Sequence, residues 1–386
     1  MAVEFLPGNR LTLLRSGAEY FPELEAAIRA ARREVYLETY IYADDATGRR
    51  ISHALCEAAS RGVAVHVLVD GFGSREMLKS LAPGLREAGV RLLVFRPGTL
   101  SEAFRRDRLM RMHRKLAVAD ARVAFVGGIN VIDDMDTPGQ IPPRYDYAVR
   151  VEGPLLAPIH EAVVRLWNRV AWRRGRHAWR VSHPLTPEAA RKGDQRAAFV
   201  ARDNFRHRRD IEEAYLEAID SARQEIVIAC AYFFPGRRFR RALTGAAARG
   251  VRVALLLQGR VEYLLLHYAS RALYGTFLEA GVEIYEYHKS FMHAKVAVVD
   301  GHWATVGSSN IDPFSLLLAR EANAVVEDRR FAARLRSLLR GDMERGARVV
   351  AKESWFAQPL WRRIPIWLGY GLARFTIGMF GFSGRF

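Results

Sequence analysis

The chain has 386 residues, of which 50% are hydrophobic and 26% are charged. This length allows two domains with apolar cores of their own, and this composition excludes a disordered chain or a small disulfide-stapled scaffold. The 59 Lys and Arg residues against 42 Asp and Glu give a net charge of +17, which favours polyanions or anionic membranes as partners. The two cysteines, Cys56 and Cys230, lie too far apart in the sequence for a zinc-type pair and are too few for a disulfide framework.

The N-terminus has no basic start followed by an apolar run, so we expect no signal peptide there. The first predicted elements are an amphipathic helix over about residues 20–33 and a buried strand over residues 35–42. The same pair recurs later as a helix over about residues 210–223 and a strand over residues 226–234. Strands that alternate with helices in both places predict an α/β fold of two similar halves, each with a mixed, mainly parallel sheet flanked by helices.

The segment between the two halves changes composition. Residues 171–196 are rich in Arg, Gly, Pro and Trp and have no sustained hydrophobic period. We therefore predict four regions along the chain: an N-terminal half, a linker, a C-terminal half and a hydrophobic tail. Their expected bounds are 1–175, 176–200, 201–350 and 351–386.

Near the end of each repeat lies the same sparse motif, HxKxxxxD. The two copies are formed by His113, Lys115 and Asp120 in the first half and by His293, Lys295 and Asp300 in the second. Each copy lies on a predicted strand that turns into a second strand, and each continues into a small-residue turn that ends in Asn130 or Asn310. A repeated pattern of this specificity is not expected by chance, so we expect the two motifs to carry the chemistry of the protein.

The spacing within each motif predicts how its side chains are used. Residues two apart on a strand share a face, so His113 and Lys115 can contact one group, as can His293 and Lys295. The aspartates lie an odd number of residues from the histidines and should face away from them. We therefore expect Asp120 and Asp300 to fix the turn or the hairpin rather than to carry protons.

The paired motifs are suited to a phosphate ester. The lysines can neutralise its oxygens, while Asn130, Asn310 and the turn amides of Gly128 and Ser308 can donate hydrogen bonds to it. One neutral imidazole can attack phosphorus to form a phosphohistidine while the other, protonated, protonates the departing alkoxide. This chemistry requires no metal or other cofactor.

Each catalytic imidazole also needs a carboxylate behind it to fix its tautomer. Asp146 and Glu321 each open the apolar strand that follows one of the motifs, and we predict this role for them. The alternative is that both are ordinary surface or salt-bridged acids.

These residues resemble the phospholipase D superfamily, and within it the bacterial cardiolipin synthases of the short type without N-terminal transmembrane helices. The resemblance covers about residues 5–345, and it is carried by both motifs and by residues 111–115, 125–130, 146–154, 231–236 and 302–313. It implies transfer of a phosphatidyl group from one phosphatidylglycerol to another, with release of glycerol. It also implies that His113 is the nucleophile and His293 the acid and base, an order that the motifs alone leave open. The alternative is a phosphodiesterase of the same superfamily that hydrolyses phospholipid head groups or nucleic acid.

Lipid substrates would place the protein at a membrane, and three segments are candidates for contact with it. Residues 100–112 mix Arg with bulky apolar side chains, residues 261–277 are rich in Leu and Tyr, and residues 364–382 carry a single charge, Arg374. The first two could equally be core helices with a solvated face. For the third we expect an in-plane anchor rather than a span, because Arg374 and several glycines disfavour insertion. The expected partners are anionic phospholipid and the cytoplasmic face of the inner membrane, with nucleic acid the less favoured partner.

Overall fold

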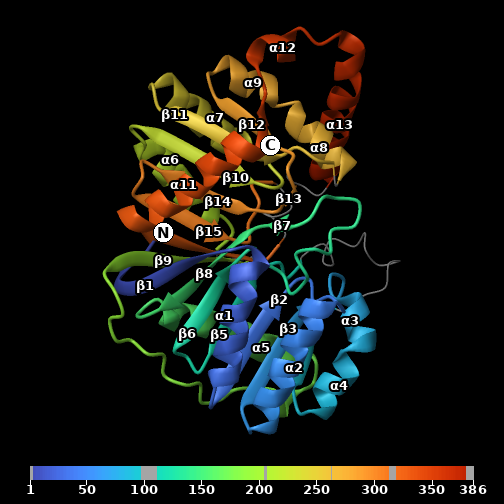
Figure 1. Ribbon diagram of the computed structural model, residues 1–386, viewed down its shortest axis with the longest axis vertical. Coiled ribbons are helices and arrows are strands. Elements are labelled where there is room, and N and C mark those ends of the chain that lie inside the picture. The colour runs from blue at the N-terminus through green and yellow to red at the C-terminus, as the bar shows by residue number, and fades with distance from the viewer. Residues whose placement is uncertain (1–2, 97–110, 204–206, 262, 313–318, 380–386) are drawn as a thin grey trace.

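A computed structural model describes residues 3–96, 111–203, 207–261, 263–312 and 319–379. The two halves of the chain lie one above the other, the first coloured blue to green and the second yellow to red in Figure 1. The predicted duplication is visible in the matching order of their elements.

The first half contains β1 (Leu6–Arg15), α1 (Ser16–Ala30), β2 (Glu34–Thr39), α2 (Ala46–Ser60), β3 (Ala64–Asp70), α3 (Arg75–Ser80), α4 (Ala82–Glu87), β4 (Arg91–Phe95), β5 (Lys115–Ala119), β6 (Val123–Gly127), β7 (Arg144–Tyr145), β8 (Tyr147–Glu152) and α5 (Leu156–Arg173). Between α5 and the next strand, the described secondary structure is one short 3-10 helix, His177–Trp179.

The second half contains β9 (Gln195–Arg202), α6 (Asp210–Ser221), β10 (Glu225–Cys230), α7 (Arg237–Ala248), β11 (Arg252–Gln258), α8 (Leu264–Arg271), α9 (Tyr274–Glu279), β12 (Glu283–Tyr287), β13 (Phe291–Met292), β14 (Lys295–Val299), β15 (Trp303–Gly307), β16 (Glu321–Glu327) and α11 (Arg329–Gly346). The chain then continues through β17 (Ala347–Val349), α12 (Lys352–Phe356) and α13 (Leu360–Met379).

All but two of these strands form one 15-stranded sheet, in the order β17-β12-β11-β10-β14-β15-β16-β9-β1-β8-β6-β5-β2-β3-β4. The order is the same in both halves when it is followed outward from the central antiparallel pair β1–β9. The mixed α/β architecture is thus confirmed, but parallel pairing does not dominate. Within the described part of this sheet, only β2–β3–β4 and β10–β11–β12 pair in parallel, because helices connect those strands. The inner strands pair antiparallel, and the β5–β6 and β14–β15 pairs are tight hairpins.

The motif aspartates hold these hairpins in place. Asp120 and Ala121, at the β5–β6 turn, both have positive φ (51° each), as do Asp300 and Gly301 at the β14–β15 turn (49° and 63°). The Asp120 carboxylate accepts hydrogen bonds from the backbone N–H groups of residues 32–34 at 2.8–3.0 Å. The Asp300 carboxylate accepts in the same way from residues 223–225 at 2.8–2.9 Å. Both aspartates thus join a hairpin turn to the start of the neighbouring strand.

Replacing Asp300 by Ala should therefore reduce the free energy of unfolding, by about 1–3 kcal/mol, since three backbone donors lose their acceptor. Burial alone would raise the pKa of Asp300, but the three N–H donors outweigh it and lower the pKa below the ordinary value. The wild-type advantage should be present above pH ~4, the ordinary aspartate pKa, and fade as the pH falls through the lowered folded-state pKa. Urea denaturation of both proteins across pH 3–7 measures this, and a pH-independent difference would contradict it.

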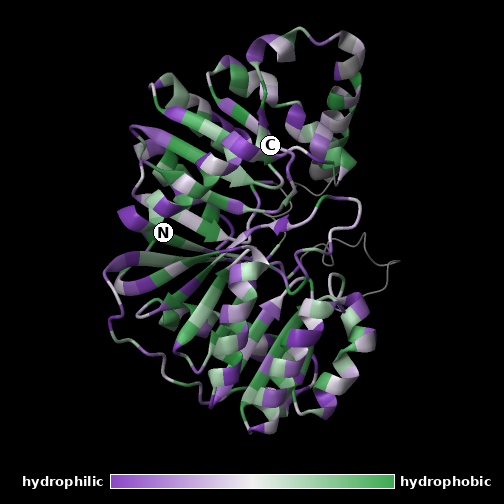
Figure 2. Ribbon diagram, in the orientation of Figure 1, coloured by the Kyte–Doolittle hydropathy of each residue, from purple (hydrophilic) through white to green (hydrophobic). Residues whose placement is uncertain are grey.

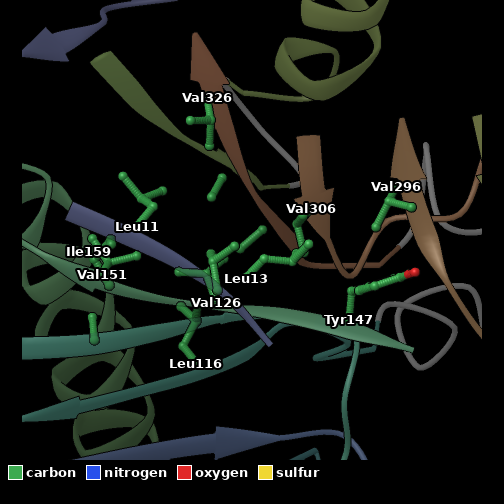
Figure 3. Packing of buried hydrophobic residues seen from close by; sticks show 14 of the residues in the cluster. Leu11, Leu13, Leu116, Val126, Tyr147, Val151, Ile159, Val296, Val306 and Val326 are labelled. Carbon is green, nitrogen blue, oxygen red and sulfur yellow. The ribbon is translucent and has the colours of Figure 1, made fainter. Parts of the chain in front are cut away.

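The two halves share one hydrophobic core across the central strands. Figure 3 shows Leu11 and Leu13 of β1 packed among side chains of both halves, including Val126 of β6 and Val306 of β15. Figure 2 shows the hydrophobic residues concentrated along the strands of each half. Because the shared core fixes one half against the other, it also fixes the distance between their motifs.

The tail folds back onto the second half. Helix α13 lies beside α8, where Ile366 and Ala373 are buried, and a Cβ built on Gly369 would lie 2.7 Å from Tyr268 Cβ (Figure 1). In the part of the chain that the structure describes, no helix has the length and apolarity needed to cross a membrane. Of the other two candidate membrane segments, residues 100–110 lie outside the described residues, and residues 264–271 form α8.

Candidate active site

The first motif histidine is anchored to the opposite half of the molecule. The residues before β5 run beside the start of β16: the N–H of His113 donates to Arg320 O (3.0 Å) and the N–H of Arg320 donates to Arg111 O (2.8 Å). The buried Asp70, at the end of β3, accepts from the N–H of Met112 at 3.0 Å. His113 is therefore positioned by backbone contacts on both sides before any side chain is considered.

The second motif repeats this arrangement with the halves exchanged. Strand β13 pairs in parallel with β7, and the N–H of His293 donates to Tyr145 O at 2.7 Å. In each case the accepting carbonyl belongs to the residue just before one of the predicted carboxylates, Asp146 or Glu321. The two motif segments thus cross between the halves.

The carboxylates of Glu321 and Asp146 also contact the histidine of the opposite half. Nδ1 of His113 lies 2.9 Å from Oε1 of Glu321, and Nδ1 of His293 lies 2.7 Å from Oδ2 of Asp146. Both acids are buried, and neither is a surface residue. Each ring is backed by the acid of the other half, although each acid follows the motif of its own half in the sequence.

The motif lysines are buried in the same cluster. Nζ of Lys115 donates to the backbone carbonyl of its own motif histidine, His113, at 2.6 Å, and Nζ of Lys295 does the same to His293. Nζ of Lys295 also lies 3.8 Å from Oδ2 of Asp146. Both ammonium groups are therefore held against the strands from which the histidines project.

The electrostatics of the cluster favour neutral imidazoles. Burial lowers the pKa of His113, which Glu321 partly offsets, and burial together with Lys295 and Arg144 holds the pKa of His293 well below its ordinary value. Burial also lowers the pKa of Lys115 to about 7, with the nearby charges of Glu321 and Lys295 acting in opposite directions. Because groups of both motifs shift one another, the two motifs form a single electrostatic site.

The small-residue turns serve the carboxylates. The N–H groups of Gly128 and Ser308, expected at the phosphate, instead donate to Tyr147 O (2.9 Å) and Ala322 O (3.0 Å) in strand pairing. The hydroxyl of Ser308 donates to Oε2 of Glu321 at 2.5 Å. At the equivalent position, a Cβ built on Gly128 would lie 2.4 Å and 2.5 Å from the oxygens of Asp146. One turn thus hydrogen-bonds its acid and the other leaves room for it.

Gly128→Ala should therefore displace Asp146 and lower turnover by about 10- to 100-fold, the usual cost of disturbing a group that orients a catalytic ligand. Gly245→Ala is the matched control, because a Cβ built at that position in α7 would lie 3.9 Å from the side chain of Arg249, an ordinary van der Waals distance. Initial rates and thermal midpoints of both variants check this. Equal rates for the two would contradict the steric argument.

The two asparagines of the turns are buried near the motifs. Oδ1 of Asn130 accepts from the N–H of Ile41 at 3.0 Å, and Oδ1 of Asn310 lies 4.0 Å from Sγ of Cys230. The amide oxygen of Asn130 thus faces the residues just after β2, and the amide oxygen of Asn310 faces the last residue of β10.

Sequence reasoning did not single out three features of this site. Asp70 holds the residue before His113, the ring of Tyr40 lies 4.9 Å from the His113 ring, and Ser308 holds Glu321 by its side chain. Of these three, only Asp70 could have been found from the sequence. It ends a predicted buried strand, and a carboxylate at a covered strand end must accept hydrogen bonds from nearby donors.

Comparison with known proteins agrees with this geometry. The family model described as "Cardiolipin synthase, PLD-like domain" matches residues 24–135 and 215–343, one segment in each half. Cardiolipin synthase B of Escherichia coli K12 is 40% identical over 341 residues, 88% of this chain and 82% of that protein. The major cardiolipin synthase ClsA of Bacillus subtilis 168 is 30% identical over 370 residues, 93% of this chain and 74% of that protein.

Among solved structures, phosphatidylserine synthase of Haemophilus influenzae Rd KW20 has the same fold, with a TM-score of 0.72 at 14% identity over 99% of this chain and 97% of that one. The family model matches a segment in each half, and the two relatives are 40% and 30% identical over most of both chains. The two HxKxxxxD motifs also cross between the halves. The chain belongs to the cardiolipin synthase family of phospholipase D-like proteins.

Proposed function

We propose that the protein is a cardiolipin synthase that transfers a phosphatidyl group between two phosphatidylglycerol molecules. The observation that carries the proposal is the crossed pair of imidazoles, His113 on Glu321 and His293 on Asp146, with Lys115 and Lys295 buried beside them. A double displacement at a phosphodiester needs one oriented neutral imidazole to attack phosphorus, a second imidazole to donate and accept a proton, and lysines beside the phosphoryl oxygens. The names of the relatives support the same reaction.

In the first step Nε2 of His113 attacks phosphorus, and the bond from phosphorus to the glycerol oxygen breaks. His293, protonated at Nε2, gives its proton to that oxygen, so glycerol leaves as the neutral alcohol. The Glu321 carboxylate accepts the Nδ1 proton of His113 and keeps Nε2 free for attack. Lys115 and Lys295 balance the charge that develops on the phosphoryl oxygens.

In the second step the hydroxyl of another phosphatidylglycerol gives its proton to His293 and attacks phosphorus. The phosphorus–nitrogen bond to His113 breaks, and cardiolipin and the free enzyme result. The Nδ2 ends of Asn130 and Asn310 serve as donors to the phosphoryl oxygens, since the Oδ1 of each amide faces the strand behind it. Gly128 and Ser308 serve the reaction through the carboxylates rather than through their amides.

A single assay tests the function. The purified protein in detergent receives phosphatidylglycerol labelled in both the glycerol head group and the acyl chains. Labelled cardiolipin and an equal amount of free glycerol are expected. Phosphatidic acid with glycerol would show a hydrolase, and cleavage of single-stranded DNA without lipid turnover would replace the proposal by the nuclease alternative.

The substrate places the site at a bilayer, and α13 is the proposed contact. Six of its large apolar side chains are 50–68% exposed: Trp361, Ile364, Trp367, Leu368, Leu372 and Phe375. Arg363 and Arg374 lie on the same helix, and the exposed Tyr263 and Leu264 lie at the start of the neighbouring α8. Aromatic and aliphatic side chains mixed with arginine are typical of a helix that lies in the plane of an anionic membrane surface.

The double substitution Trp367→Ser/Leu368→Ser should therefore lower binding to phosphatidylglycerol vesicles by at least about tenfold, because each side chain contributes about 1.5–3 kcal/mol when buried in apolar surroundings. Activity on detergent-dispersed lipid should change little. Trp172→Ser is the matched control, because Trp172 is 60% exposed at the end of α5 in the other half. Flotation with vesicles gives the comparison, and equal flotation of all three proteins would remove α13 as the contact.

A further inference from the structure

The strand segments that carry His113 and Glu321 have a second face, away from the catalytic cluster. Side chains alternate along a strand, so Arg114 and Arg320 project opposite to the residues beside them. Both line a cavity of about 350 Å³ between the halves, bordered by α5, β9 and the start of α6. His113, Lys115, His293, Lys295 and Glu321 are absent from its wall. The cavity is therefore separate from the proposed active site.

The wall of this cavity is rich in guanidinium groups, contributed by Arg114, Arg165, Arg169, Arg202 and Arg320. Arg114 binds Glu38 through two hydrogen bonds, and Arg165 pairs with Glu161. Among the described residues, Arg169 and Arg320 have no ion-pair partner.

Four acidic residues also line the wall. Glu161 is engaged with Arg165, and Asp210 binds Nδ1 of His207 at 2.7 Å. Glu4 is exposed at the entrance, and an oxygen of Asp203 accepts from the N–H of His207. The wall as a whole is therefore close to charge balance, and the positive charge without an ion-pair partner among the described residues is local to Arg169 and Arg320.

These cations repel one another in a partly desolvated space. Burial, with the charges of Arg114 and Arg169, lowers the pKa of Arg320 to about 10, although Asp203 and Glu38 act in the opposite direction. Burial also lowers the pKa of Arg202 to about 10, although Glu321 acts in the opposite direction. Arg169 and Arg320, which have no ion-pair partner among the described residues, can be stabilised by an oxyanion that they bind through paired hydrogen bonds.

We propose that this cavity is a second binding site, specific for a phosphate group and distinct from the catalytic cluster. Its volume is within the usual range of small-molecule sites, and apolar side chains such as Leu6, Leu155 and Phe199 line it beside the arginines. It therefore accepts inorganic phosphate or the phosphoglycerol head of a lipid. The inference does not depend on which reaction the motifs catalyse.

A ligand in this cavity is well placed to influence the active site. The backbone of Arg320 is hydrogen-bonded to both Arg111 and His113, and Glu321 follows it directly. An anion held by the Arg320 side chain thus fixes the segment that aligns His113 with its carboxylate. Occupancy should stabilise the crossed arrangement of the first motif.

Titration calorimetry with inorganic phosphate tests the proposal on the full chain. We expect two sites in the wild-type protein, one at the motifs and one in the cavity. Arg169→Gln should weaken one of them at least tenfold and leave the other unchanged. Arg334→Gln is the matched control, because Arg334 is an exposed arginine on α11, outside the cavity. Thermal midpoints measured without ligand establish that both variants are folded.

Two further ligands identify the source of the phosphate. Glycerol phosphate and short-chain phosphatidylglycerol below its micelle concentration are titrated in the same way. If all three ligands fill the Arg169-dependent site equally, it is a soluble-anion site, and a clear preference for the acyl-bearing ligand makes it a lipid head-group site. If no binding is detected, or if Arg169→Gln binds all three ligands as the wild type does, the proposal is overturned. Loss of lipid turnover alone bears on the proposed reaction and not on this site.

Discussion

Replacing either His113 or His293 by Ala is expected to reduce cardiolipin formation by about 10⁴-fold or more, since residues that act as one catalytic unit cannot substitute for each other. His267→Ala is the control: this histidine lies in α8 outside both motifs and should retain near wild-type rates. Release of glycerol from labelled phosphatidylglycerol is the measurement. Substantial activity in either motif variant would refute the two-histidine mechanism.

The same variants separate the nucleophile from the acid. A nitrophenyl phosphodiester of the same lipid has a leaving group that needs no proton, so it bypasses the general acid but not the nucleophile. With this substrate, His293→Ala should recover much of its lost first-step rate and His113→Ala should not. The opposite pattern would exchange the two roles.

The second large effect concerns the acids behind the rings. Glu321→Gln and Asp146→Asn should each lower turnover by about 10²- to 10⁴-fold, because an amide can stabilise the wrong imidazole tautomer and cannot balance the imidazolium charge. Glu327→Gln, at the far end of β16 on the surface with Arg196, is the matched control. Steady-state rates and circular dichroism of the three variants give the comparison.

The nitrophenyl substrate also tests the crossing between halves. Because Glu321 supports His113, its amide variant should remain slow with the activated leaving group. Because Asp146 supports His293, Asp146→Asn should recover. Recovery of Glu321→Gln instead would mean that each acid serves the histidine of its own half.

The fold could be predicted from the sequence to the extent that it depends on local pattern. The buried strands at residues 35–42 and 226–234 were correctly located, apart from a few residues at their ends. The sheet has less parallel pairing than expected, because the predicted alternation of helices and strands does not extend to the inner strands, where three-residue connections (120–122 and 300–302) form hairpins. The residue type of Asp120 and Asp300 was the sequence signal for these turns, because aspartate adopts positive φ more readily than most residues and both do so here.

The site shows the same division. The HxKxxxxD repeats identified His113, Lys115, His293 and Lys295, because all residues of each motif lie within eight consecutive positions of the chain. The amides of Gly128 and Ser308 were assigned to the phosphate on the same local grounds. Their engagement with strands β8 and β16 depends on pairing that the sequence does not state.

The sequence by itself determined that the chain is a duplication with two copies of one catalytic motif, since repetition and spacing are properties of the linear order. Only the tertiary structure decided which acid supports which histidine. The start of β16 lies beside His113, and β7 pairs with β13, so backbone hydrogen bonds between distant segments bring each carboxylate to the opposite motif. Packing of the shared core fixes that exchange, and no separation along the chain encodes it.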